Sequence, residues 1–222
     1  MKSLHPVRLI VLAALLLVPA SAAAGEPDAG RILEGLQDWL DRSDTLSGRF
    51  EQSLVSGAFG EGIRESGQVW IHRPGRMRWD YTEPEAKTAI LRGSSTLFYE
   101  QEARQMMVGT LDEGGGMLAS LLAGEERLAD LFAARRIDRP DLSEGRGWFL
   151  QLVPHQAGEG FEEVTLFVGR KFQLRAVEVL DASGNRVLYR FSDLMRNVEI
   201  PDAIFGFEPP EGTEILGEAA GG

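Results

Sequence analysis

The amino-acid sequence predicts a mainly β domain of the α+β class, with one leading helix and one helical insert. Three observations predict it. Apolar residues recur at three- and four-residue spacing over residues 28–45 and again over residues 114–132. Elsewhere the period is mostly two, and turn-forming residues separate the alternating segments at short intervals, which favours an antiparallel meander. A length of 222 residues suits one such domain.

The first 24 residues have the pattern of a cleaved export signal. Lys2 and Arg8 form a basic start, and residues 9–18 form an apolar run that is too short for a comfortable membrane span. Small residues then offer cleavage after Ala22 or Ala24. We expect residues 1–24 to be removed and residues 25–222 to form a single domain, with an uncleaved anchor as the alternative. No second apolar run follows, so we expect no stable membrane insertion of the mature chain.

The leading helix is expected over residues 28–45, because its apolar residues fall on one side. We expect that side to pack against the rest of the domain. The predicted apolar face consists of Ile32, Leu33, Leu36, Trp39 and Leu40, and the predicted polar face of Glu34, Gln37, Asp38 and Asp41.

Short strands are expected on both sides of the helical insert. Turns rich in glycine, proline, serine or asparagine separate most of them. The segment 200–216 is too rich in proline for a central strand. The predicted strands are 46–55, 63–73, 76–81, 87–92, 95–100, 104–109, 135–138, 148–154, 162–168, 173–181 and 186–194.

Several of these strands are apolar on both faces. In the strand at 162–168, Val164, Leu166 and Val168 alternate with Thr165 and Phe167. Two packed sheets would explain this pattern, and so would a single large sheet that curls around helices. The helical insert interrupts the series of strands, so it is expected to cover a face or an open end of the sheet.

The charge of the chain disfavours nucleic acid as a partner. Without residues 1–24, which contain Lys2 and Arg8 but no acidic residue, 21 basic and 34 acidic side chains leave a net charge of −13. Such a chain repels phosphate backbones, and it contains no long basic run. It also contains no cysteine, which excludes disulfides and a lipid-modified cysteine.

The sequence contains no recognisable catalytic or metal-binding motif. After the leader only His72 and His155 remain, and they lack the spacing of metal ligands. Acidic residues such as Asp80, Glu83 and Glu85 could form a hydrolytic pair, but a chain this acidic produces such clusters by chance. We therefore expect no catalytic residue, no metal site and no cofactor, and we favour a binding protein over an enzyme.

Four segments carry a resemblance to a known family: 48–52 (GRFEQ), 67–85 (GQVWIHRPGRMRWDYTEPE), 90–105 (ILRGSSTLFYEQEARQ) and 205–216 (FGFEPPEGTEIL). In order and spacing they resemble the LolA family of periplasmic outer-membrane lipoprotein carriers. The positions that match its pattern are Phe50, Gln52, Gly67, Arg73, Pro74, Gly75, Trp79, Pro84, Gly93, Leu97, Tyr99, Gln105, Pro209, Pro210 and Gly212.

This resemblance implies a fold and a function. The fold is a curled antiparallel sheet that forms an incomplete β-barrel, whose concave side is covered by the N-terminal helix and a helical lid. The function is that of a periplasmic chaperone, which shelters lipoprotein acyl chains in an apolar cavity. The implied partners are acylated lipoproteins, an inner-membrane ABC transporter complex (LolCDE-like) that loads the carrier, and an outer-membrane receptor (LolB-like) that unloads it.

The resemblance also suggests residue roles. Arg73 matches the arginine that holds the family's lid shut through backbone carbonyls, although a solvated charge at a strand end is the alternative. The candidate lid leucines could equally be ordinary core residues, and Gly114 to Gly116 and Gly124 are candidate hinges. The candidate cavity and lid residues are Phe50, Trp70, Met77, Trp79, Tyr81, Leu118, Leu121, Leu122, Leu128, Leu131 and Phe132.

Two departures from the family pattern affect the expected cargo. Arg92 stands where the family usually has aspartate, and Gly114 to Gly116 replace a proline at the start of the lid. The lid is therefore expected to be looser. A carrier of another lipid, such as a glycolipid or a polyene lipid, and a periplasmic lipid or lipoprotein sensor that regulates stress signalling remain alternatives.

Overall fold

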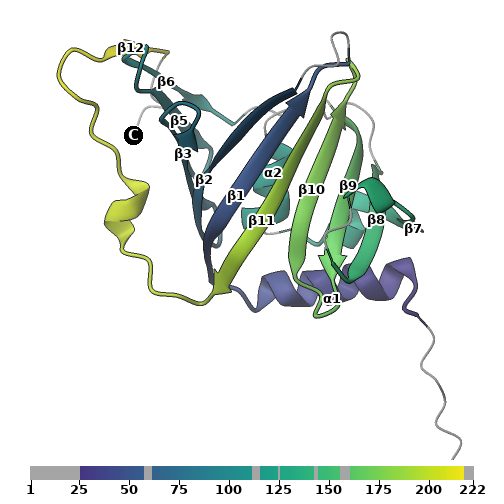
Figure 1. The fold of residues 1–222 in the computed structure, drawn as a ribbon. Coiled ribbons are helices and arrows are strands. Elements are labelled where there is room, and N and C mark those ends of the chain that lie inside the picture. Colours follow the sequence, from purple (N-terminus) through teal and green to yellow (C-terminus); the bar gives the residue numbers. More distant parts are fainter. Residues whose placement is uncertain are drawn as a thin grey trace, which may run out of the picture.

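The computed structural model describes residues 26–57, 62–111, 116–124, 126–142, 145–155 and 161–217. The expected export signal lies outside these residues. The described strands form one open, curled sheet of twelve strands with helices on its concave side (Figure 1). The mainly β prediction is confirmed, and the alternative of two packed sheets is wrong.

The observed elements follow the predicted series closely, with shorter helices and one additional strand. The first half contains α1 (Ala29–Asp41), β1 (Thr45–Val55), β2 (Gly62–His72), β3 (Arg76–Glu83), β4 (Lys87–Arg92), β5 (Ser95–Glu100), β6 (Gln105–Thr110), α2 (Gly116–Ala123) and α3 (Leu128–Leu131). The second half contains β7 (Phe132–Ile137), η1 (Pro140–Leu142), β8 (Gly147–Pro154), β9 (Phe161–Gly169), β10 (Leu174–Asp181), β11 (Arg186–Arg196), η2 (Asp202–Phe205) and β12 (Glu214–Leu216).

The strand order explains why the barrel is incomplete. The sheet runs β12-β6-β5-β4-β3-β2-β1-β11-β10-β9-β8-β7, so β1 and β11 pair in its middle, and the sheet does not close into a ring. Strands β12 and β7 are left at the two edges. All neighbouring pairs are antiparallel except β12 and β6, which are parallel. The parallel edge strand was not predicted.

Helix α1 covers one end of the concave side (Figure 1). Asp28 caps it by accepting a hydrogen bond from the Arg31 amide at 2.8 Å. The predicted apolar face is buried, but the predicted polar face is wrong at Gln37, which is only 5% exposed. Gln37 follows Leu33 by four residues and precedes Leu40 by three, so it lies within the apolar stripe.

One hydrophobic cluster fills the space between the sheet, α1 and the short helices α2 and α3. Its members come from nearly every element, and many have no exposed surface. Phe132 belongs to it but was wrongly predicted to be helical. Helix α3 ends at Leu131, and Phe132 opens β7 opposite Pro154 with an extended backbone.

A second, smaller cluster lies on the convex face, beneath the connection between β7 and β8. It consists of Leu142, Phe149, Phe167, Ala176 and Leu188. Burial on both sides of the sheet explains why these strands are apolar on both faces.

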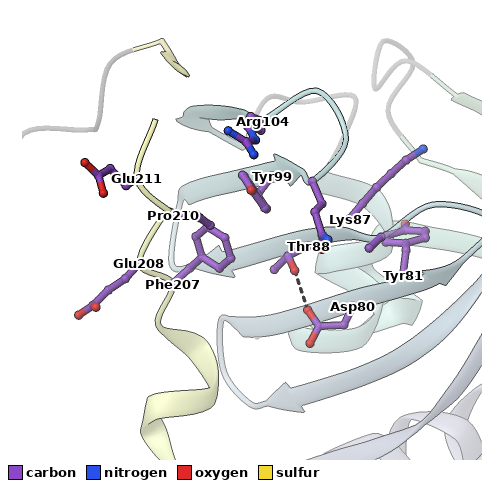
Figure 2. Close-up of a pocket in the computed structure, with 12 residues that line it drawn as sticks. Asp80, Tyr81, Lys87, Thr88, Tyr99, Arg104, Phe207, Glu208, Pro210 and Glu211 are labelled. Carbon is purple, nitrogen blue, oxygen red and sulfur yellow. Dashed lines mark hydrogen bonds between the residues drawn. The ribbon is translucent and has the colours of Figure 1, made fainter. Parts of the chain in front are cut away.

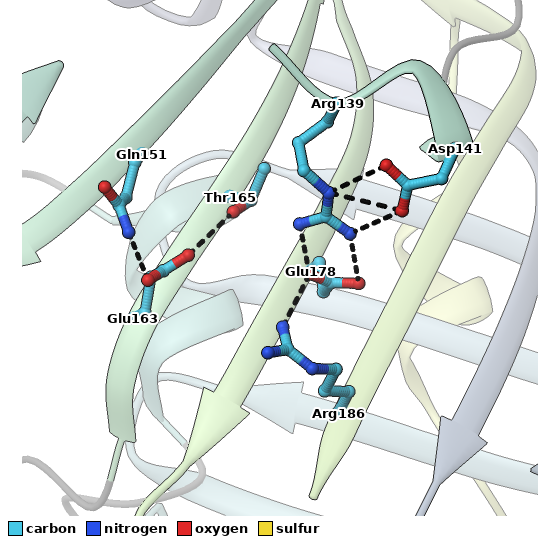
Figure 3. Close-up of polar contacts among 7 residues, drawn as sticks. All are labelled: Arg139, Asp141, Gln151, Glu163, Thr165, Glu178 and Arg186. Atoms are coloured by element: carbon cyan, nitrogen blue, oxygen red, sulfur yellow. Dashed lines mark hydrogen bonds and ion pairs between the residues drawn. The ribbon is translucent and has the colours of Figure 1, made fainter. Parts of the chain in front are cut away.

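An ionic network holds the same connection in place (Figure 3). The buried Glu178 carboxylate accepts hydrogen bonds from Arg139, at 2.9 Å and 3.3 Å, and from Arg186 at 3.1 Å. Arg139 also donates to Asp141, the second residue of η1, at 2.9 to 3.2 Å. The network therefore fixes the connection against β10 and β11.

The C-terminal arm, residues 197–217, runs past the outer side of β3 to β5 (Figure 1). Arg76 forms an ion pair with Asp202 at 2.7 Å, and Arg78 donates to the carbonyls of Ile204 and Gly206 at 2.9 Å and 3.1 Å. These two arginines of the aromatic, arginine-rich β2–β3 hairpin thus bind the chain's own C-terminal arm.

Candidate functional site

The candidate site is the concave face of the sheet together with the helical segment that covers it. We call α2 and α3, with the described residues between them, the lid (residues 116–124 and 126–131). Leu121, Leu122 and Leu128 are at most 2% exposed, and Leu131 packs against the same cluster. The structure thus brings these four predicted lid residues over the sheet. The side chain of Leu118 lies outside the described residues, as do Gly114 and Gly115.

The sheet contributes an aromatic wall opposite the lid. Phe50 contacts Trp79 with ring centroids 4.7 Å apart and Tyr81 at 4.9 Å, in both cases edge to face. The Tyr81 hydroxyl donates to Gln52 Oε1 at 2.8 Å. Met77, Trp79 and Tyr81 alternate along β3 and therefore share one face. Four of the five predicted wall residues are thus brought together.

Trp70 is the predicted wall residue that lies elsewhere. Its neighbours Val69 and Ile71 are buried in the concave cluster, so the alternation of the strand turns Trp70 to the convex face. There it pairs with Ser47 and Arg78 across the neighbouring strands. We do not include it in the candidate site.

Arg73 connects the β2–β3 turn to the lid. Its side chain is 13% exposed, and Nη2 donates to the Gly124 carbonyl at 2.9 Å. The neighbouring Gly75 amide donates to the Ala123 carbonyl at 3.1 Å, from a left-handed conformation (φ +73°) that favours glycine. Ala123 is the last residue of α2 and Gly124 follows it, so the turn holds the middle of the lid.

The charge of Arg73 is only partly compensated. The nearest carboxylate oxygen, Asp41 Oδ1, lies 3.9 Å from Nη2, and the buried Nη1 has no hydrogen-bond partner among the described residues. Burial lowers the pKa of Arg73, and the charge of Asp41 opposes that shift. The closed lid therefore leaves part of this guanidinium unsatisfied.

Gln37 is a second attachment point, which the sequence analysis missed. Its Oε1 accepts from the Leu128 amide at 2.8 Å, and its Nε2 donates to Asp41 Oδ1 at 2.8 Å. Leu128 begins α3, so Gln37 satisfies an amide that has no partner within that helix. Through Asp41 the two attachment points, Gln37 and Arg73, form one polar chain at the edge of the apolar interior.

The interior behind the lid is filled by side chains in this structure. Leu36 of α1, Phe50 of β1, Leu122 of α2 and Leu150 of β8 are each at most 1% exposed. The structure therefore shows the lid closed against the wall. Space for a ligand on this side requires the lid to move.

A pocket of about 640 Å³ lies instead on the convex side, between β3 to β5 and the C-terminal arm (Figure 2). Phe207 of the arm packs against Tyr99 with the two rings tilted and their centroids 4.9 Å apart. Asp80 at its floor accepts hydrogen bonds from Thr88 at 2.9 Å and from Arg78 at 2.8 Å. Asp80 thus orients Arg78, which in turn donates to the arm at Ile204 and Gly206.

The described residues include no group of three or more histidine, aspartate or glutamate side chains placed to hold a metal ion. None of the helices in the described ranges combines the length and the apolar character needed to span a bilayer.

Comparisons with known proteins agree with this architecture. The family model for the outer membrane lipoprotein carrier protein LolA matches residues 41–208. An outer-membrane lipoprotein carrier protein of Dechloromonas aromatica is 32% identical over 204 residues, covering 91% of this chain and 92% of the relative. The corresponding protein of Alkalilimnicola ehrlichii is 34% identical over 208 residues, covering 92% of this chain and 89% of the relative.

A solved structure supports the fold alone. The uncharacterized conserved protein from Thermus thermophilus aligns with a TM-score of 0.51 at 12% sequence identity, covering 84% of this chain and 97% of that one. The match of the family model over most of the chain, together with these relatives, decides the classification. The chain belongs to the LolA family of outer-membrane lipoprotein carrier proteins.

Proposed function

We propose that this protein is a periplasmic carrier that binds the acyl chains of lipoproteins between the aromatic wall and the lid. It would receive them from an inner-membrane ABC transporter complex and deliver them to an outer-membrane receptor. The observation that carries the proposal is a lid closed over an apolar interior, with its middle and its second helix held by a few polar contacts at Arg73, Gly75 and Gln37.

The energetics of an acyl chain explain why such a device is needed. Burying hydrocarbon yields about 0.8 kcal/mol per methylene, so a 16-carbon chain left in water costs on the order of 12 kcal/mol. A carrier must therefore offer an apolar surface of comparable size. An exposed surface of that size on the empty protein would promote aggregation, so the empty carrier has to be closed.

The lid contacts are weak enough for this closure to be reversible. A typical hydrogen bond contributes about 0.5–1.5 kcal/mol net, and one to a charged group about 1.5–3 kcal/mol. The contacts at Arg73, Gly75 and Gln37 therefore supply only a fraction of the free energy that a buried acyl chain yields. A bound chain can displace the lid, and the lid can compete for its own site when the cargo leaves.

This function needs binding and release, and no bond is made or broken. The leucines of the lid and the aromatic side chains of the wall would contact the hydrocarbon, and Arg73 and Gln37 would set the stability of the closed state. Export to the periplasm is part of the proposal, supported by the leader pattern in residues 1–24.

The test is to identify what the protein binds. Protein isolated gently from the periplasm of its own host should carry acylated polypeptide, detected by native mass spectrometry. Delipidated protein should take up a synthetic diacylated peptide and ignore the same peptide without acyl chains. A glycolipid or polyene lipid in place of lipoprotein would favour the alternative cargo. Absence of any acylated ligand in both experiments would contradict the proposal.

A further inference from the structure

The twelve-stranded sheet is interrupted at one end between β10 and β11. Their pairing extends only from Ala176–Leu180 to Arg186–Arg190. Strand β11 continues to Arg196 along β1, and β10 reaches back to Leu174 along β9. The two strands therefore separate beyond the Ala176–Arg190 pair, and Figure 1 shows their ends diverging above α1.

The separation has a local structural cause. The register between β1 and β11 shifts between Ser47 and Arg49, and Asp193 opposite has a left-handed backbone (φ +52°). A Cβ atom on Gly48 would lie 2.9 Å from Leu194 Cα and 2.9 Å from the Ser192 carbonyl oxygen, so the close approach requires glycine there. Such a bulge bends its strand, and β10 has a register shift of its own against β9, between Leu174 and Ala176, at the same end.

A pocket of about 570 Å³ occupies this gap, which we call the β10–β11 opening. Its volume lies within the range of roughly 300–1,000 Å³ typical of small-ligand sites. Trp39 of α1, Leu174 of β10 and Phe191 of β11 line it, and all three belong to the interior cluster that also includes the lid leucines. The apolar side of the opening is therefore formed by residues of the interior cluster.

The mouth of the opening is polar and faces solvent. Arg175 lines it and is exposed, and its guanidinium has no hydrogen bond or ion pair to the described residues. Asp193, the acidic residue of the rim, is paired with Arg49. A guanidinium left with its donors available suits a ligand that carries an oxygen acceptor, such as an ester carbonyl.

We propose that the β10–β11 opening receives one acyl chain of the lipoprotein cargo, an inference that rests on the proposed carrier function. The chain lies against Trp39, Leu174 and Phe191, and its ester carbonyl meets Arg175. An acylated polypeptide joins a hydrocarbon chain to a polar backbone that stays in water. The opening places side chains of the apolar cluster directly beside a solvent-facing mouth.

Photo-crosslinking tests the location of the chain. A diacylated peptide with a diazirine at the chain terminus is bound, irradiated and mapped by mass spectrometry. Crosslinks at Trp39, Leu174 or Leu194 are expected, together with crosslinks at the lid. Crosslinks confined to the lid and β3 would show that the opening is not a binding site, and they would still agree with the carrier function. If the peptide forms no crosslink at any position, the carrier function itself is contradicted.

A substitution at the rim tests the contribution to affinity. Ser192 is exposed and lines the opening, so Ser192→Trp fills it from outside without changing the interior. The expected loss of affinity for the diacylated peptide is roughly tenfold, equivalent to about two fewer buried methylenes. Thr110→Trp, at an exposed position of β6, is the matched control and should bind like the parent. Parent-like affinity of a folded Ser192→Trp protein overturns the inference.

Discussion

Arg73 and Arg78 come from one short stretch of sequence and hold different parts of the chain. Arg73 donates to the Gly124 carbonyl in the middle of the lid, whereas Arg78 donates to the C-terminal arm at Ile204 and Gly206. The guanidinium group offers several donors in a fixed plane, which suits the capture of backbone carbonyls. The same residue type therefore anchors a segment on each side of the sheet.

The pair provides a matched test of the lid contact. Arg73→Leu removes a hydrogen bond that exists only in the closed state, so the empty carrier loses stability relative to the loaded one. A net loss of about 1–2 kcal/mol would slow release of a fluorescent diacylated peptide to acceptor vesicles by about 5- to 30-fold. Arg78→Leu should release at the parent rate. Equal rates for the Arg73 variant and the parent would remove Arg73 from the mechanism.

Tyr81 of the wall and Tyr189 of β11, whose ring lies 5.5 Å from that of Trp79, report burial through their ionisation. Burial, together with the nearby charge of Glu65, raises the pKa of Tyr189 to about 12 and also raises that of Tyr81. Because the folded state holds these protons more tightly than the unfolded state, their stabilisation is complete below about pH 10 and is lost as the pH rises through 12. We expect the tyrosinate absorbance of these two residues at 295 nm to rise only well above pH 10, near pH 12 for Tyr189. Ionisation of Tyr81 or Tyr189 near pH 10 in a folded Tyr99→Phe protein would show that the wall is open to water.

At the scale of elements, Gln37 couples α1 to the second half of the lid. Gln37→Leu would leave the Leu128 amide buried without an acceptor, which costs about 1–3 kcal/mol. The lid should then open more often, and trypsin should cleave after the exposed Arg127 about tenfold faster, since proteolysis follows the open population. Glu34→Leu, on the exposed face of the same helix, should leave the cleavage rate unchanged. Unchanged cleavage in Gln37→Leu would show that this bond does not hold the lid.

The regular elements could be predicted because their residues repeat with a period of two or 3.6. Met77, Trp79 and Tyr81 were placed on one face of a strand by alternation alone, and the structure has them there. The same alternation explains the error at Trp70. Neighbouring residues in a strand face opposite sides of the sheet, and only the strand pairing shows which side is inside. Gln37 was missed because a polar residue in an apolar stripe gives no sign of its partner.

Features that depend on contacts between distant segments could not be predicted in the same way. The β10–β11 opening lies beside a register shift at Gly48, and predicting that shift requires knowledge of how β1 pairs with β11. The convex cluster depends on the connection at Leu142 folding back over the sheet. In the sequence, the only sign of the opening is a glycine, and the only sign of the convex cluster is a strand that is apolar on both faces.

For the whole molecule, the arrangement predicts two levels of stability. The lid rests on few backbone contacts, whereas β1 is paired along its length with both β2 and β11 at the centre of the sheet. Local openings therefore release the lid at a lower free energy than global unfolding. The Leu128 amide, bonded to Gln37, and the Gly75 amide, bonded to Ala123, report the first process. The amides of β1 report the second.

Hydrogen exchange with and without cargo should separate these levels. A ligand that binds only the folded state at 100 times its dissociation constant adds about 2.7 kcal/mol, so exchange in β1 should slow about 100-fold if it occurs by global unfolding. A ligand that displaces the lid must at the same time speed exchange at Leu128 and Gly75. Opposite changes in the two groups of amides are thus the signature of a carrier that opens to load. Slower exchange in both groups would mean that the lid stays closed over its cargo, and the polar contacts at Arg73 and Gln37 would then stabilise the loaded state instead of the empty one.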